Sequence, residues 1–138
     1  AATYPTLDGL IEAKYALKGG YWQRAAWIFH RDIVKLIAKL KDGEGRPALE
    51  LASTPGMPDR LLGLPLYVSE YAPNTATSAL YVGIVGDFSY YWLAEALQFE
   101  LQRLDELYAE TNQVGFIGRL EADGMPVLAE AFARVKLG

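Results

Sequence analysis

The stretch from Gly86 to Phe132 constrains the fold most, because two of its patterns favour different structures. Residues 90–110 are mostly good helix formers, and their summed propensity favours one long helix. Apolar residues nevertheless alternate strictly with polar ones, Leu97, Phe99 and Leu101 with Gln98, Glu100 and Gln102. A period of two places the three apolar side chains on one face of a strand, whereas a helix would separate them in steps of about 200°. The pattern therefore predicts a strand over residues 97–102.

Further extended pieces are predicted after a polar break at residues 109–113. Residues 114–120 and 126–128 are typical of strands, and the Glu-Ala-Asp-Gly run at 121–124 predicts a turn between them. The second half of the chain is thus expected to hold long strands.

Two helices are predicted in the first third of the chain. Thr6 is the expected N-cap of the first, which runs to about Leu17 before a glycine pair. The second is expected over residues 31–41, since apolar residues recur there at helical spacing. Its expected inward residues are Ile33, Val34, Ile37 and Leu40.

Short apolar runs predict buried strands at residues 25–29, 65–69 and 79–85. Pro65 is expected at a first position or a sheet edge, because it cannot donate a ladder hydrogen bond. Glycine and proline predict loops at 42–47 and 53–58. The elements together predict an α+β fold, a mixed sheet with two flanking helices. The expected core is Ile28, Ile33, Ile37, Leu66, Val68, Val82 and Ile84.

Composition sets limits on the function. The chain has 138 residues, 51% of them hydrophobic and 22% charged, which is typical of one folded domain. A net charge of −4 argues against a surface devoted to gripping phosphate backbones. The absence of cysteine excludes disulfides and thiolate metal sites, and no apolar run is long enough to span a membrane. No membrane partner is therefore expected.

Candidate catalytic and metal-binding residues are few. His30, beside Asp32, could act as a general base, but its simpler interpretation is a hydrogen-bonded residue at a strand-to-helix junction. Asp42 and Glu44 resemble a calcium loop only faintly, because the third acidic or amide ligand and the distal Glu are missing.

The remaining patterns also have structural explanations. Residues 83–86 lack the third glycine of a dinucleotide fingerprint, which favours close backbone packing. The paired carboxylates at 105–106 and at 121 and 123 flank predicted turns in an exposed segment. We therefore predict no enzyme activity, and no catalytic, cofactor-binding or metal-binding residue.

Two surface patterns remain open. Arg31, Lys35 and Lys39 recur every four residues, typical of a solvated helix face but also usable for phosphate contacts. Tyrosine and tryptophan are frequent, and such residues are enriched where subunits meet as well as in cores. The candidates are Tyr21, Trp22, Tyr67, Tyr71, Tyr81, Tyr90, Tyr91 and Trp92.

Five segments occur in the order found in tailed-phage major capsid proteins. These are TLDGLIEAKYALKGGYWQRAAWIFHRD, LKDGEGRP, LLGLPLYVSE, GDFSYYWL with RLDELYAE, and VGFIGRLEADG with AFARVKL. The chain thus resembles that family over nearly its whole length, from Thr3 to Leu137. The resemblance implies the Hong Kong 97-like capsid fold. Residues 1–89 and 128–138 would form the axial domain, with the final strand returning to its sheet, and residues 90–127 part of the peripheral domain.

The resemblance also implies a function. The protein would be a structural capsid protein of a tailed phage or prophage, located in the virion capsid and, during assembly, in the host cytoplasm. Its partners would be other copies in pentamers and hexamers, with packaged DNA touched only weakly and non-specifically. The subunit contacts expected around the axis are the loop positions Asp42, Glu44, Arg46 and Arg60. The family's N-terminal arm, extended loop and spine helix have no counterpart here, so a C-terminal fragment is expected.

Two alternatives stay open at this point. An encapsulin-like nanocompartment shell protein would share the fold, and a small α/β ligand-binding or enzyme domain with a cleft near His30 would belong to another class. No cofactor is expected for a capsid or nanocompartment shell protein. Some capsids of this fold form covalent cross-links through a lysine and an asparagine, but no such cross-link is predicted here, since the lysine-bearing loop has no counterpart in the sequence.

Overall fold

The computed structural model describes residues 4–107 and 109–137, together with all their side chains except those of Leu97 and Gln98. The chain divides into two compact units. Unit 1 comprises Ala1–Tyr90 with Leu128–Gly138, and unit 2 comprises Tyr91–Val127.

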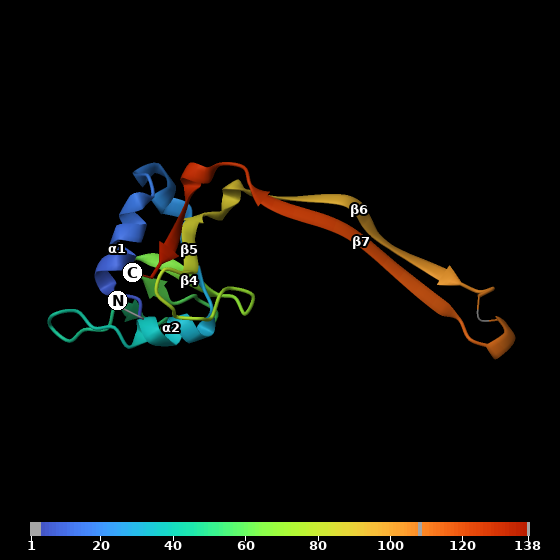
Figure 1. Ribbon diagram of the computed structural model, residues 1–138, viewed down its shortest axis with the longest axis horizontal. Helices are drawn as coiled ribbons and strands as arrows, with labels where there is room; N and C mark the ends of the chain where they lie inside the picture. Colours follow the sequence, from blue (N-terminus) through green and yellow to red (C-terminus); the bar gives the residue numbers. More distant parts are fainter. Residues whose placement is uncertain (1–3, 108, 138) are drawn as a thin grey trace. The chain divides into compact units, whose positions relative to one another are not determined.

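Unit 1 contains a six-stranded mixed sheet and two α-helices (Figure 1). The strand order is β2-β3-β4-β1-β5-β8, with β1 and β4 parallel and the other neighbours antiparallel. The elements are α1 (Leu7–Ala16), η1 (Gly19–Arg24), β1 (Ala25–Phe29), α2 (Arg31–Ala38), β2 (Leu49–Glu50), β3 (Arg60–Leu61), β4 (Leu64–Val68), β5 (Tyr81–Asp87), η2 (Phe88–Tyr90), η4 (Ala129–Ala131) and β8 (Phe132–Lys136). The predicted α+β class is confirmed.

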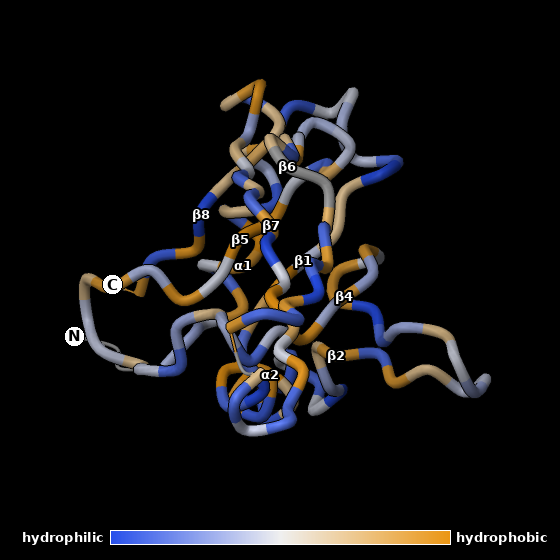
Figure 2. The backbone as a smooth tube through the Cα atoms, turned by 90° about the vertical axis from the view of Figure 1, so that its right-hand side faces the viewer, coloured by the Kyte–Doolittle hydropathy of each residue, from blue (hydrophilic) through white to orange (hydrophobic). Residues whose placement is uncertain are grey.

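Capping residues set where the helices begin. The hydroxyl of Thr6 accepts the N–H of Gly9 at 3.2 Å, which confirms the predicted cap of α1. The helix α2 ends at Ala38, three residues before the predicted end. The chain turns there, because the Ala48 N–H donates to the Leu40 carbonyl and closes the loop between them. Figure 2 shows α2 changing between hydrophobic and hydrophilic residues along its turns.

The core lies between the helices and one face of the sheet. Ile33, Ile37, Leu66 and Val82 are buried as predicted. Trp27 and Phe29 stack there with ring centroids 5.6 Å apart, so Ile28, between them on β1, points to the other face.

Three predicted core residues are therefore wrong. Ile28 and its cross-strand partner Ile84 are only half-buried on the opposite face of the sheet. Val68, at the end of β4, is 53% exposed.

The strands also differ from prediction in detail. Pro65 was expected at a first position or a sheet edge, but it is the second residue of β4, which lies between β3 and β1. The pairing of β4 with β1 starts only at Leu66, so the missing N–H of Pro65 removes no hydrogen bond between these two strands. Strand β5 begins at Tyr81 rather than at residue 79, because Ala79 has a φ of 68°, which a strand cannot contain. Close packing at Gly83 is confirmed, since a Cβ there would lie 2.2 Å from the Phe29 ring.

Unit 2 is an antiparallel hairpin of β6 (Tyr91–Leu104) and β7 (Gly115–Pro126), with the 3-10 helix η3 (Ala109–Thr111) beyond the strand ends (Figure 1). The predicted strand at residues 97–102 is confirmed, and the helix that propensity favours is not formed. The predicted turn at 121–124 is wrong. These residues continue β7, and Gly124 is needed there because Leu93 and Tyr91 lie over it, 2.8 Å from where a Cβ would stand.

Candidate functional site

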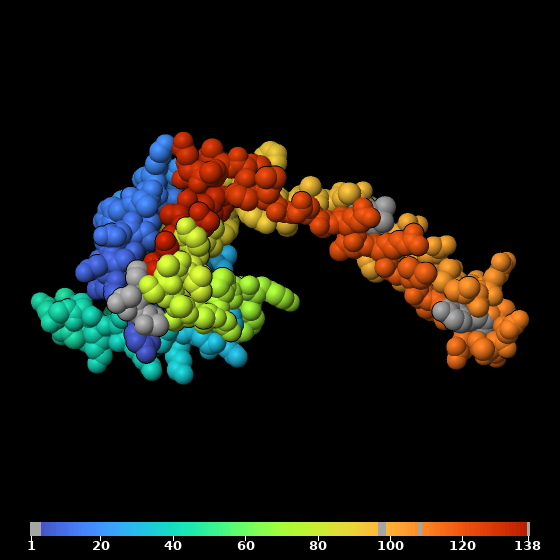
Figure 3. Space-filling model, in the orientation of Figure 1, coloured from blue at the N-terminus to red at the C-terminus, as the bar shows by residue number. Residues whose placement is uncertain are grey.

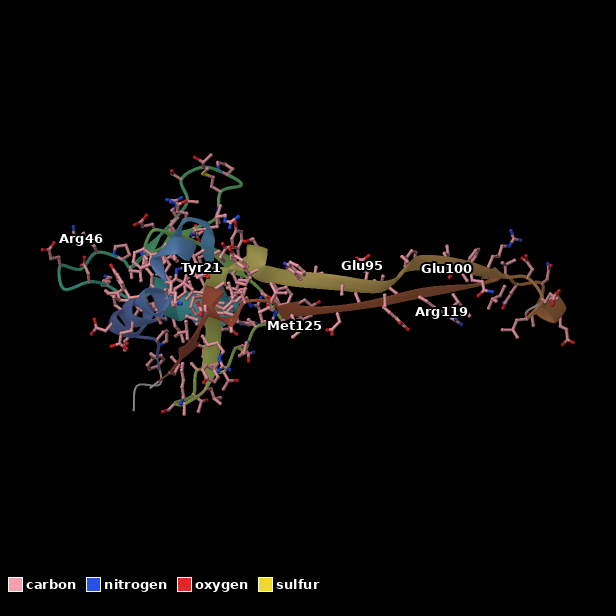
Figure 4. All side chains as sticks on the ribbon, turned by 90° about the horizontal axis from the view of Figure 1, so that it is seen from above. Tyr21, Arg46, Glu95, Glu100, Arg119 and Met125 are labelled. Carbon is pink, nitrogen blue, oxygen red and sulfur yellow. The ribbon has the colours of Figure 1, made fainter. Side chains whose placement is uncertain are left out.

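The loop after α2 brings three of the four predicted contact residues together. The Asp42 carboxylate accepts the backbone N–H groups of Arg46 at 2.8 Å and Glu44 at 2.9 Å. The Arg46 guanidinium reaches Asp42 at 3.0 Å and Glu44 at 2.8 Å. The N–H groups, that of Arg46 foremost, hold the pKa of Asp42 below its ordinary value. The loop carrying Arg46 projects from the unit (Figure 4), and this one guanidinium pairs with both carboxylates of the loop.

Arg60 does not belong to this cluster. It lies in β3 and not in a loop as predicted, and its Cα partners are Glu50 on β2 and Pro65 on β4. Its side chain is exposed. The structure therefore places the four residues in two separate regions of unit 1.

His30 is the N-cap of α2, which confirms its interpretation as a hydrogen-bonded junction residue. Its Nδ1 accepts the Asp32 N–H at 3.1 Å, so a neutral ring carries its proton on Nε2, which lies 3.1 Å from the Glu70 carboxylate. Both ring nitrogens are thus engaged in holding structure.

Asp87 was missed by the sequence reasoning. It is 2% exposed at the end of β5, and its Oδ1 accepts the Ser89 N–H at 3.0 Å and the Ser89 hydroxyl at 2.7 Å. The Arg24 guanidinium lies 3.3 Å from Oδ2. Burial opposes ionisation, but the bonds from Ser89 and the charge of Arg24 outweigh it and lower the pKa of Asp87. The Asp-x-Ser spacing, typical of an Asx turn, was the available pattern.

One face of the unit 2 hairpin exposes several large apolar side chains. In an antiparallel ladder, paired residues point to the same side and successive residues alternate. One side accordingly carries large exposed side chains: Tyr91, Leu93, Phe99, Leu101, Phe116 and Leu120. The same side also carries Glu95, paired with Ala122, and Arg103, paired with Phe116, so charged residues interrupt its apolar surface. Phe99 and Leu101 share a face as predicted, whereas the side chain of Leu97 lies outside the described part.

The other side of the hairpin is mixed. Its polar residues are Glu100, Gln102, Arg119, Glu121 and Asp123. Apolar residues lie toward its two ends, with Trp92 paired to Met125 at one end and Leu104 and Ile117 at the other. The space-filling view shows unit 2 as a slender double row of residues (Figure 3). Two strands have no interior of their own in which to bury these side chains.

The aromatic candidates separate into two groups. Tyr21 and Trp22 are half-buried, and Tyr21 meets the Tyr90 ring edge-on at 5.5 Å. Exposed rings form the second group: Tyr67, Tyr71, Tyr81, Tyr91 and Trp92. The exposed group leaves substantial apolar surface free in this single chain.

Chemical sites are not evident in the part of the chain that the structure describes. Within residues 4–107 and 109–137, no three metal-ligating side chains gather in one place. No helix among them has the length and apolar character needed to cross a bilayer. The three candidate phosphate contacts are exposed, Arg31 and Lys35 in α2 and Lys39 at its C-cap, and Arg31 approaches Glu70 at 3.6 Å.

Exposed large apolar and aromatic side chains of this kind are typical of surfaces at which proteins associate. The phage capsid family model matches residues 1–137. The chain therefore belongs to the phage capsid family, and its fold is that of phage capsid proteins.

Solved structures agree with this assignment. The chain is similar to the capsid of an empty GTA particle computed with C5 symmetry, at 25% identity and a TM-score of 0.78 over 99% of this chain and 46% of that one. The capsid of the native GTA particle gives 25% identity and a TM-score of 0.79, with 99% and 45% covered. Gordonia phage Cozz gives 17% identity and a TM-score of 0.61, with 100% and 51% covered. The chain thus spans about half the length of these relatives. A search of curated proteins gives no significant match.

Proposed function

We propose that this chain is a shell-forming part of a major capsid protein of a tailed phage or prophage. It acts as a structural protein and not as an enzyme, and it associates with other copies into pentamers and hexamers in the virion capsid after assembly in the host cytoplasm. The observation that carries this proposal is the match to capsid structures across 99% of the chain at a TM-score of 0.78.

The two units correspond in this proposal to two capsid domains. Residues 1–89 with 128–138 form the axial domain around the symmetry axes, and residues 90–127 form part of the peripheral domain. Support comes from the contact division at Tyr90 and Leu128.

Subunit contacts around the axis would involve Asp42, Glu44, Arg46 and Arg60. The internal ion pairs of the 42–46 loop favour a fixed loop shape, which a neighbour can meet without ordering it further. Each exposed ion pair adds only about 0.2 to 1 kcal/mol, so shape and repetition around a ring must supply most of the stability. Arg60, in β3, is exposed as well.

The exposed face of the hairpin would be covered by other parts of the capsid protein. Six large apolar side chains lie along it, and a monomer rarely leaves such a surface in water. Packaged DNA would be touched weakly at most, since the chain carries a net charge of −4.

Electron microscopy of the purified full-length protein tests the proposal. Closed shells with five-fold vertices are the expected result. A folded full-length protein that stays monomeric at every concentration and ionic condition tried would overturn it. The charge-reversed variant Arg46→Glu, which breaks the two ion pairs of the 42–46 loop, should assemble less well, whereas Lys35→Glu, at an exposed position of α2, serves as a matched control.

A further inference from the structure

We infer that capsomer rings are closed by the loop of residues 51–58, the knob loop, inserting into a groove on the open face of the neighbouring subunit's sheet. This inference rests on the proposed function and names the contact by which unit 1 would form rings. A five-fold ring needs two different, complementary surfaces on each subunit, because its contacts run head to tail.

The knob loop presents apolar side chains in a fixed shape. Leu51 is 76% exposed and Met57 is 68% exposed. The loop is closed at its base by the Ala52 N–H, which donates to the Asp59 carboxylate at 2.8 Å. Gly56 turns the chain with a φ of 86°, a left-handed conformation that favours glycine. Figure 2 shows this loop leaving β2 and projecting from the unit.

The sheet groove lies on the face turned away from the helices. Its main lining residues are Ile28, Tyr71, Ala72, Tyr81, Ile84 and Arg134. Tyr71 is fully exposed, and the Arg134 guanidinium stacks on the Tyr81 ring at 4.2 Å. This chemistry suits Met57 of a second copy, because a thioether packs well against aromatic rings and fills irregular gaps.

Charge favours the same pairing. Among the ion pairs of the described residues, none involves Arg134 or Lys136 of β8. Both residues lie on the groove side of that strand, because they pair with the groove residues Ile84 and Tyr81. The base of the knob loop carries Glu50 and Asp59 against one cation, Arg60. A net negative knob thus meets a net positive groove, which steers association and fixes its register.

A subunit cannot satisfy its own groove with its own knob loop. The knob loop joins β2 to β3 at one end of the sheet, while the groove spans β1, β5 and β8 toward the other. Strand β5 stands three strands from β3, about 14 Å away at the usual spacing. The two surfaces therefore remain free for neighbours.

Disulfide trapping tests the contact. The full-length protein, with the introduced cysteines as its only ones, carries Met57→Cys and Tyr71→Cys, and assembled particles are oxidised and run on a denaturing gel. A head-to-tail contact links each subunit to two neighbours and should give a ladder up to the ring. The matched control combines Met57→Cys with Tyr15→Cys, an exposed position on α1, and should give no ladder.

The outcomes separate the contact from the function. Particles that form without a ladder, or a ladder from the control pair, overturn the inference and leave the capsid function standing. If the unmodified protein forms no particles, the proposed function fails and the inference fails with it.

A charge swap decides the case if the cysteine variants do not assemble. Glu50→Arg and Arg134→Glu should each raise the concentration needed for assembly by about five- to tenfold. The double variant should restore it to within about twofold of the unmodified protein, whereas a double variant worse than either single one overturns the inference.

Discussion

Replacing Ile37 by alanine tests whether α2 is anchored to the sheet as described. Ile37 is 0% exposed and sits in the core shared with Ile33, Trp27 and Phe29. The variant keeps helix propensity, because alanine is the better helix former, so a loss of stability reports on packing alone.

The magnitude follows from the atoms removed. Ile37→Ala deletes three carbons, worth about 2.4 kcal/mol at about 0.8 kcal/mol for each buried methylene. The surrounding residues relax only partly around the remaining cavity, which brings the expected loss to about 3 to 4 kcal/mol. For a domain of about 100 residues, each kcal/mol lowers Tm by roughly 4 to 8 °C, so a fall of more than about 12 °C is expected.

Urea unfolding followed by tryptophan fluorescence and far-ultraviolet circular dichroism measures this loss. The buried Trp27, whose indole N–H donates to the Leu61 carbonyl at 3.0 Å, reports on unit 1. Val68→Ala is the matched control, because Val68 is 53% exposed and should lose less than about 1 kcal/mol. Equal losses in the two variants would refute the assignment of the inward face.

The remaining predictions concern strand packing, a buried carboxylate and association. Gly83→Ala should cost about 1 to 3 kcal/mol or more by calorimetry because its Cβ would meet the Phe29 ring, whereas Gly43→Ala, with open space around it, should be nearly neutral. Asp87→Asn should destabilise by about 1 to 3 kcal/mol at neutral pH. Because the pKa of Asp87 is lowered, its stabilisation is present above about pH 4 and is lost as the pH falls through that lowered pKa, so unfolding between about pH 5 and 2 should depend less on pH in this variant. The chain alone should form monomers or small rings at micromolar concentration and self-associate weakly, and Phe99→Ser should reduce that association in light scattering behind a sizing column; closed particles from this chain alone would contradict the reasoning.

The sequence predicted the elements whose cause is local. Thr6 marks the start of α1, and the alternation at residues 97–102 outweighs a helical propensity that no buried face supports. Strand β1 matches its predicted bounds, because five apolar residues stand between a 3-10 helix and a capping histidine.

The spacing of residues along the chain did not predict which face of the sheet a side chain takes or which distant residue it contacts. An all-apolar strand such as β1 gives no alternation, so whether Ile28 or its neighbours Trp27 and Phe29 face the helices is decided only by what packs on each side. The Asp87 cluster depends on Arg24 from a separate turn. The Glu-Ala-Asp-Gly run has turn composition, yet its glycine serves the close approach of Leu93.

The ladder of unit 2 shows how the hairpin keeps its apolar side chains together. Register shifts occur between Glu95 and Leu97 and again between Leu97 and Glu100, and each adds one residue to β6 relative to β7. One bulge would turn every later side chain of β6 to the other face, but two restore the original side. Leu93 before the bulges and Leu101 after them consequently lie on the same side as the even-numbered residues of β7. The Phe99 ring, over Gly118, is on that side too. A hairpin that only needed to be long would not require this compensation. Keeping the large apolar side chains on one face through two irregularities is what a strand pair needs when its other surface is supplied by assembly, and this favours association as the work of the chain.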